Sequence, residues 1–170
     1  MTISFPEPTA PARSRTEVLV RYLDYYRAVV LAKVDGLTEA QLRGSIVPSG
    51  WSPIELVKHL TYVELRWLEW GFEGAPLADP WGDHEGERWH VGDDEAAADL
   101  LAALQARGRV TAAIAHRHLL DDVGAPGERW DGASPATLER CLLHVMQEYA
   151  RHLGHLDVVR ELLDGVTGES

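Results

Sequence analysis

The stretch at residues 141–155 reads CLLHVMQEYARHLGH, and its spacing decides how the rest of the chain is interpreted. In a helix, side chains three, four, seven and eleven residues apart share one face. The groups on that face here that could bind a metal or carry a proton are Cys141, His144, Glu148, His152 and His155. The same face carries the apolar side chains Val145, Leu156, Val159 and Leu163. Because an unpaired charge in a buried stripe costs on the order of several kcal/mol, we expect a compensating partner, and a metal ion is the candidate.

Length and composition favour a single domain. A chain of 170 residues predicts a flexible arm over residues 1–13 and one domain over residues 14–170. The formal charge of -11, without a basic stripe, argues against nucleic acid and anionic membrane as partners. The single cysteine excludes an internal disulfide framework. No signal-peptide pattern and no run of roughly 18 apolar residues is present, so we expect a cytoplasmic protein.

Helical periodicity appears first in the N-terminal half of the chain. The first long helix is predicted from Ser14 to just before Gly36, and residues 38–43 predict a short extra turn. The second long helix begins at Ser52-Pro53-Ile54-Glu55, where serine caps the helix, proline takes its first position and glutamate completes a capping box. It should run to about Glu73.

The C-terminal half predicts two further helices. Asp93 or Asp94 is the expected cap of a third helix that continues to Leu119. Residues 134–135, a second Ser-Pro pair, are the expected start of a fourth helix that ends at about Asp164. Four long helices without strand alternation predict an all-α protein, a four-helix bundle whose topology is either up-down or crossover.

Residues 74–92 predict a long ordered connection rather than strands. The segment is rich in glycine and proline, and loops of this length usually have a function or cover a site. Trp81 and Trp89 flank Asp83-His84-Glu85 and could cover the site. His84 and His90 are expected to be solvated loop histidines.

The helical spacing predicts a metal site with ligands from two helices. Glu148 and His152 lie one turn apart, so both can bind one cation. His59, near the apolar stripe of the second long helix, is the best third ligand. Two histidines and a carboxylate leave coordination positions for water or substrate, as in catalytic rather than structural zinc sites. The donor set suits zinc, nickel, iron or manganese.

Other readings of these residues remain open. The polar side chains could simply be hydrogen-bonded to one another in the core, and His144 with Glu148 offers the same one-turn spacing. His155 could support His152, contact substrate, or act as a general base. Cys141 is expected to be a small packed core residue.

Two motifs resemble a known family. GWSPIELVKHL at residues 50–60 and LHVMQEYARHLGHLDVVRELLDG at residues 143–165 resemble the DinB-like superfamily, particularly its actinobacterial branch. The resemblance implies a four-helix bundle with a divalent metal, zinc first among the candidates, held by His59, Glu148 and His152. Many members carry histidine where this chain has Glu148, and the glutamate resembles the mycothiol-dependent maleylpyruvate isomerase branch. His155 stands where many relatives carry glutamine, so no role for it is inherited.

The resemblance also implies an activity and a partner. Similar proteins use a low-molecular-weight thiol, mycothiol or bacillithiol, and transfer it to small electrophiles or isomerise its adducts. The family resemblance implies a homodimer as well. The expected function is therefore a metal- and thiol-dependent S-transferase or isomerase, with His155 as the candidate catalytic residue. The alternatives are a non-catalytic, stress-related metal-binding protein and a metal-dependent hydrolase.

Overall fold

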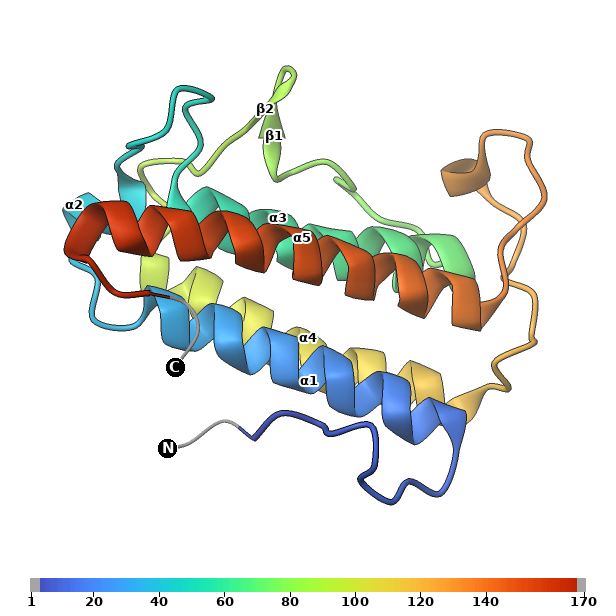
Figure 1. Ribbon diagram of the computed structural model, residues 1–170. Helices are drawn as coiled ribbons and strands as arrows, with labels where there is room; N and C mark the ends of the chain where they lie inside the picture. Colours follow the sequence, from blue (N-terminus) through green and yellow to red (C-terminus); the bar gives the residue numbers. More distant parts are fainter. Residues whose placement is uncertain (1–3, 168–170) are drawn as a thin grey trace.

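The computed structural model describes residues 4–167, and these form a bundle of four long helices (Figure 1). The bundle confirms the predicted all-α fold class. The long elements are α1 (Arg15–Val34), α3 (Pro53–Glu64) continued by the π-helix η1 (Leu65–Phe72), α4 (Ala97–Arg117) and α5 (Leu138–Asp164). The short elements are α2 (Glu39–Arg43), the two-stranded hairpin β1 (His84–Glu85) and β2 (Arg88–Trp89), and the 3₁₀ turn η2 (Glu128–Trp130).

The bundle has a crossover topology. Helix α1 packs against α4 and α5, and α3 packs against the same two helices, so α1 and α3 occupy diagonal corners. In Figure 1, α3 and α4 run in the same direction, opposite to α1 and α5. The chain must therefore return along the whole bundle between Phe72 and Ala97. We call residues 73–96 the crossover connection.

Local signals explain where the first two long helices begin. The Ser14 side chain accepts a hydrogen bond from the Glu17 amide at the start of α1. At the start of α3, Ser52 and Glu55 form a reciprocal capping box around Pro53. Both satisfy amide groups that the first helical turn would otherwise leave unpaired. These two predicted helix starts are confirmed.

The third helix begins later than predicted. The cap of α4 is Ala96, which makes no side-chain capping bond, so the assignment of Asp93 or Asp94 as cap is wrong. The Glu95 carboxylate instead accepts the Gly92 amide and the Lys58 ammonium, which holds this segment as a turn before the helix. The helix also ends at Arg117, before Leu119.

The start of the fourth helix and the absence of strands were also predicted wrongly. Thr137 and Val123 form an isolated antiparallel bridge, and the Gly124 amide donates to the Ala136 carbonyl at 3.0 Å. This pairing keeps the backbone extended, so α5 starts at Leu138 rather than at the Ser-Pro pair. Within the crossover connection, residues 84–89 form a small hairpin. Gly86, at φ +62°, supplies the left-handed turn residue between its strands.

A buried polar network joins the four long helices through Glu64. The Arg27 guanidinium of α1 donates to both Glu64 oxygens, at 2.9 and 3.0 Å. The Tyr149 hydroxyl of α5 donates to Oε1 at 2.5 Å, and the Thr111 hydroxyl of α4 donates to Oε2. Burying a charge is tolerated when its hydrogen bonds are satisfied, as they are here.

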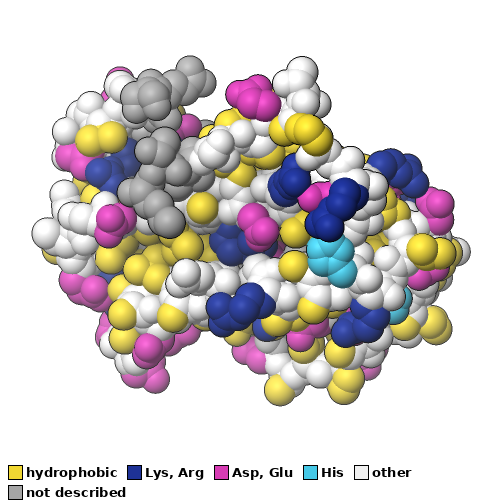
Figure 2. Space-filling view, turned by 90° about the horizontal axis from the view of Figure 1, so that it is seen from below, with side chains coloured by type: hydrophobic (Ala, Val, Ile, Leu, Met, Phe, Trp, Pro, Cys, Tyr) yellow, Lys and Arg dark blue, Asp and Glu magenta, His cyan; other side chains and the backbone are white. Residues whose placement is uncertain are grey.

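The surface carries mixed charges. On the face drawn in Figure 2, Lys and Arg side chains are interspersed with Asp and Glu and with hydrophobic side chains. The arm lies against α1, where the Phe5 ring meets the rings of Tyr22 and Tyr25 edge-on. Among the described residues, no helix is long and apolar enough to cross a membrane.

Candidate metal centre

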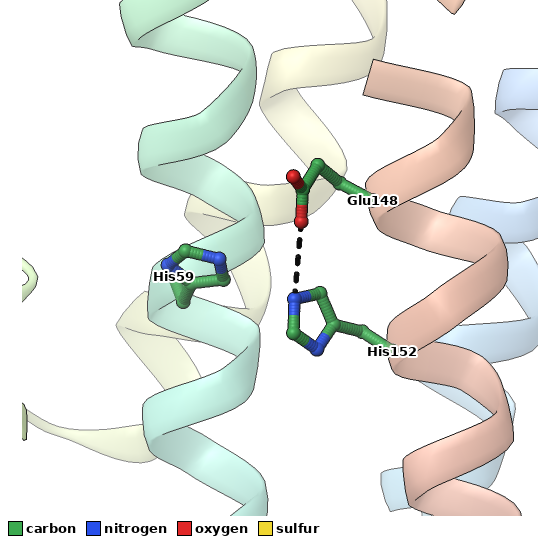
Figure 3. Close-up of side chains that lie close together, drawn as sticks. All are labelled: His59, Glu148 and His152. Atoms are coloured by element: carbon green, nitrogen blue, oxygen red, sulfur yellow. Dashed lines mark ion pairs between the residues drawn. The ribbon is translucent and has the colours of Figure 1, made fainter. Parts of the chain in front are cut away.

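The three predicted ligands meet between α3 and α5. Figure 3 shows His59 on one helix facing Glu148 and His152 on the other. His152 Nε2 lies 3.2 Å from Glu148 Oε2, and one ligand atom from each of the three residues lies within 4.8 Å of the others. Ligands about 2.1 Å from a tetrahedral ion are roughly 3.4 Å apart. The three side chains therefore fit one ion with small side-chain adjustments.

The flanking residues fix the positions of these ligands. In α3 the neighbours Leu56 and Leu60 are fully buried, which holds the His59 backbone against the core. In α5, Val145 and Tyr149 are fully buried and play the same part for Glu148 and His152. Because the helix faces are fixed by packing, the ligands are preorganised rather than free to move in solvent.

Burial keeps both histidines neutral. Burial, together with charge repulsion from the neighbouring His59 and His155, lowers the pKa of His152 to about 3. Burial also lowers the pKa of His59 and outweighs its hydrogen bond to Asp83, which acts in the opposite direction. A neutral imidazole has a free lone pair, so both rings can bind a cation at neutral pH.

Asp83, which was not among the predicted site residues, supports His59 from the crossover connection. Its Oδ2 lies 3.0 Å from His59 Nδ1, and Arg66 donates to both of its oxygens, at 2.5 and 3.1 Å. Burial alone would raise the pKa of Asp83, but hydrogen bonds from His59 and Arg66 hold that pKa well below its usual range. The only sequence signal was an Asp-His pair between two tryptophans in a long loop.

His84 completes a second group of possible ligands, with His59 and Asp83. Its Nδ1 lies 2.9 Å from Asp83 Oδ1, so the expectation of a solvated loop histidine is wrong for His84. The Arg66 guanidinium already neutralises Asp83 within this group. A dication beside a guanidinium would be repelled, and we therefore favour the His59, Glu148 and His152 set.

Aromatic rings from the crossover connection and from the segment before α3 cover the centre. The Trp89 ring stacks on the His59 ring at 4.2 Å and meets the His152 ring edge-on at 5.1 Å. Trp51 lies 6.2 Å from Trp89 and 6.1 Å from the His155 ring. A pocket of about 190 Å³ opens beside them, lined by Ser49, Gly50, Trp51, Glu87, Arg88 and Trp89. In Figure 1 the hairpin that carries Trp89 lies over α3 and α5.

The remaining candidate residues either contact the three candidate ligands, pack in the core or lie in the loop. His155 is exposed at the edge of the centre rather than on the buried face, and its Nδ1 lies 3.3 Å from His152 Nδ1. His144 Nε2 lies 3.3 Å from the other oxygen of Glu148, and its ring contacts Trp67. Cys141 is buried, and burial raises the pKa of its thiol to about 11, as suits a packing residue. The His90 side chain is partly exposed in the loop, in agreement with its prediction as a solvated histidine.

The chain is similar to one known protein family. No curated protein matches the chain. The family model described as mycothiol-S-transferase matches residues 18–165, which include nearly all of the bundle and all three candidate ligands. This family is DinB-like, which confirms the resemblance seen in the two motifs. The chain belongs to the mycothiol-S-transferase family.

Proposed function

We propose that this protein is a metal-dependent S-transferase that joins mycothiol to a small electrophile. The observation that carries the proposal is the convergence of His59, Glu148 and His152, with ligand atoms within 4.8 Å of one another, in a chain of this family. Two neutral imidazoles and a carboxylate form the donor set of catalytic zinc sites. Zinc is our first choice, and nickel, iron or manganese would suit the same ligands.

The chain's own residues would bind the thiol and manage its proton. A divalent ion held by these ligands supplies Lewis acidity, which lowers the pKa of a thiol at the site. His155, exposed and 3.3 Å from His152 through the Nδ1 atoms of both rings, is our candidate to take up the thiol proton. Trp89 and Trp51 shield one side of the centre from water, and the pocket between them is where we place the thiol.

An activity assay tests the proposal. Metal-loaded protein should consume mycothiol in the presence of an electrophile such as monochlorobimane, and His152→Ala should lose nearly all of that activity. His90→Ala is the control, because the side chain of this histidine is 45% exposed and its ion-pair partner is Glu85 rather than a residue of the centre. A wild-type protein that binds metal yet transfers no thiol to any of a panel of electrophiles would instead indicate a non-catalytic metal-binding protein.

A hydrolase is the second candidate. It is favoured by one observation, the exposed His155 in contact with His152, since a histidine so placed could act as a general base toward water. Ester or amide hydrolysis that proceeds without added thiol would support it and contradict the transferase. A homodimer and a cytoplasmic location stay predictions.

A further inference from the structure

Asp83 is fully buried although it lies in a connection rather than in a long helix. Buried carboxylates are rare unless their hydrogen bonds are satisfied. Both oxygens of Asp83 are occupied: Oδ1 by Arg66 and His84, and Oδ2 by Arg66 and His59. The fold therefore places a buried negative charge, Asp83, and its counter-charge, Arg66, beside the candidate centre.

The ion pair with Arg66 determines which kind of hydrogen bond Asp83 can form with His59. Arg66 faces Asp83 with two donors, so the aspartate is charge-neutralised in its ionised form and can only accept hydrogen bonds. The Nδ1 of His59, 3.0 Å from Oδ2, must then carry the ring proton. The lone pair is left on Nε2.

This choice of nitrogen matches the direction of the ring. In Figure 3 one ring nitrogen of His59 points toward Glu148 and His152, and the other points away from them. A histidine that binds a cation through one nitrogen is oriented by the bond that its other nitrogen makes. The Asp83 bond thus selects both the tautomer and the ring plane that the centre needs.

We propose that Asp83 is a positioning residue that holds His59 with its proton on Nδ1 and thereby sets the metal affinity of the centre. The inference rests on the proposed metal site. It also gives the crossover connection a role, because the segment that carries Asp83 carries Trp89 onto the same imidazole. The segment that covers the centre thus also orients one of its candidate ligands.

The first test measures zinc affinity. Metal-free Asp83→Asn and wild-type protein are titrated with zinc in competition with a chromophoric chelator, and we expect the variant to bind roughly 10- to 100-fold more weakly. Glu95→Gln is the matched control. It weakens the 2.7 Å bond from Lys58 that ties the same connection to α3, without touching a histidine of the centre. Its zinc affinity should stay within about twofold of wild type, on the basis that ligand orientation is unchanged.

The second test reads the tautomer without metal. Nitrogen-15 NMR of the histidine rings in metal-free wild type should find the His59 proton on Nδ1, and Asp83→Asn should populate the Nε2–H form. This measurement on wild type remains decisive if the variant fails to fold.

Three results would overturn the inference: a His59 proton on Nε2 in wild type, unchanged zinc affinity in Asp83→Asn, or equal losses in Asp83→Asn and Glu95→Gln. The third would mean that Asp83 only anchors the connection. Failure of the proposed function is distinguishable, because zinc affinity and tautomer are measured without thiol transfer. If wild type binds zinc as expected but transfers no thiol, the role of Asp83 stands and the transferase does not.

Discussion

At the residue scale, the centre depends on histidines that stay neutral because they are buried. A group whose pKa is depressed in the folded state takes up its proton more readily when unfolded. The pKa of His152 falls from 6.5 to about 3 on folding. Between pH 6.5 and about pH 3, His152 therefore binds a proton in the unfolded chain but stays neutral in the folded chain. The free energy of unfolding of the metal-free protein should decrease as the pH is lowered through that interval.

The size of this effect can be measured. Between pH 7.5 and pH 5 the contribution of His152 amounts to a loss of about 2 kcal/mol in the free energy of unfolding, at about 1.4 kcal/mol per pH unit. Urea denaturation of metal-free wild type and His152→Gln at both values tests it. The variant should lose less stability than wild type on acidification, and equal losses would contradict the neutral state assigned to His152.

Spacing alone was enough to predict which side chains of two helices would face one another. The one-turn separation of Glu148 and His152 and the inward position of His59 are properties of helical periodicity, and the fold brings all three together. Asp83 could not be found in this way. Its contacts with His59 and Arg66 depend on how a long connection folds back over the bundle, and no local pattern encodes that path.

At the element scale, the crossover connection and the segment before α3 form the wall of the candidate thiol pocket. Trp51 lines that pocket without contacting His59, Glu148 or His152 through its ring. Trp51→Ala should raise the KM for mycothiol about tenfold, equivalent to about 1.4 kcal/mol of lost binding, and leave zinc affinity unchanged. Steady-state kinetics over a range of thiol concentrations give the value. An unchanged KM would indicate that the thiol binds at another part of the centre.

Gly108 within α4 tests how tightly the elements pack. A Cβ there would lie 2.6 Å from Arg27 Nη1, and Arg27 is held in place by Glu64. Gly108→Ala should therefore destabilise the protein by about 1–3 kcal/mol despite alanine's better helix propensity. Gly154→Ala in α5 is the matched control, since nothing lies within 4 Å of a Cβ there, and it should gain up to about 1 kcal/mol. Thermal unfolding of both variants compares them, and a stabilised Gly108→Ala would show that Arg27 moves freely.

Helix starts were predictable only where the signal was local. The Ser52 capping box lies within four residues and was read correctly. The second Ser-Pro pair gave a similar signal, but the bridge between Val123 and Thr137 keeps the backbone extended past it. The hairpin at residues 84–89 was missed because two-residue strands are too short to show alternation.

At the scale of the whole molecule, the Glu64 network joins all four long helices and sets their register. Glu64→Leu would leave Arg27 buried without its main counter-charge. Breaking a buried pair in this way costs about 3–5 kcal/mol, so a large fall in the urea midpoint is expected. The isosteric Glu64→Gln, which keeps part of the hydrogen bonding, should lose less. A Glu64→Leu variant with the urea midpoint of wild type would mean that the network adds nothing to the stability of the bundle.

The bundle itself was predictable because periodicity, caps and length agree on four helices. Its crossover topology was not, because both topologies place the same apolar faces inward. The topology bears on the proposed function because residues 73–96 must run along the length of the bundle. Asp83 and Trp89, within this segment, therefore contact His59 at the candidate centre between α3 and α5.

The central claim is that His59, Glu148 and His152 together bind one divalent ion, and calorimetric titration of metal-free protein with zinc tests it most directly. Wild type and His90→Ala should each bind one zinc ion per chain. His59→Ala, Glu148→Ala and His152→Ala should each bind at least about 100-fold more weakly while keeping the helical circular dichroism of wild type. A wild-type protein that binds no zinc, nickel, iron or manganese, or single variants that bind as wild type does, would contradict the account.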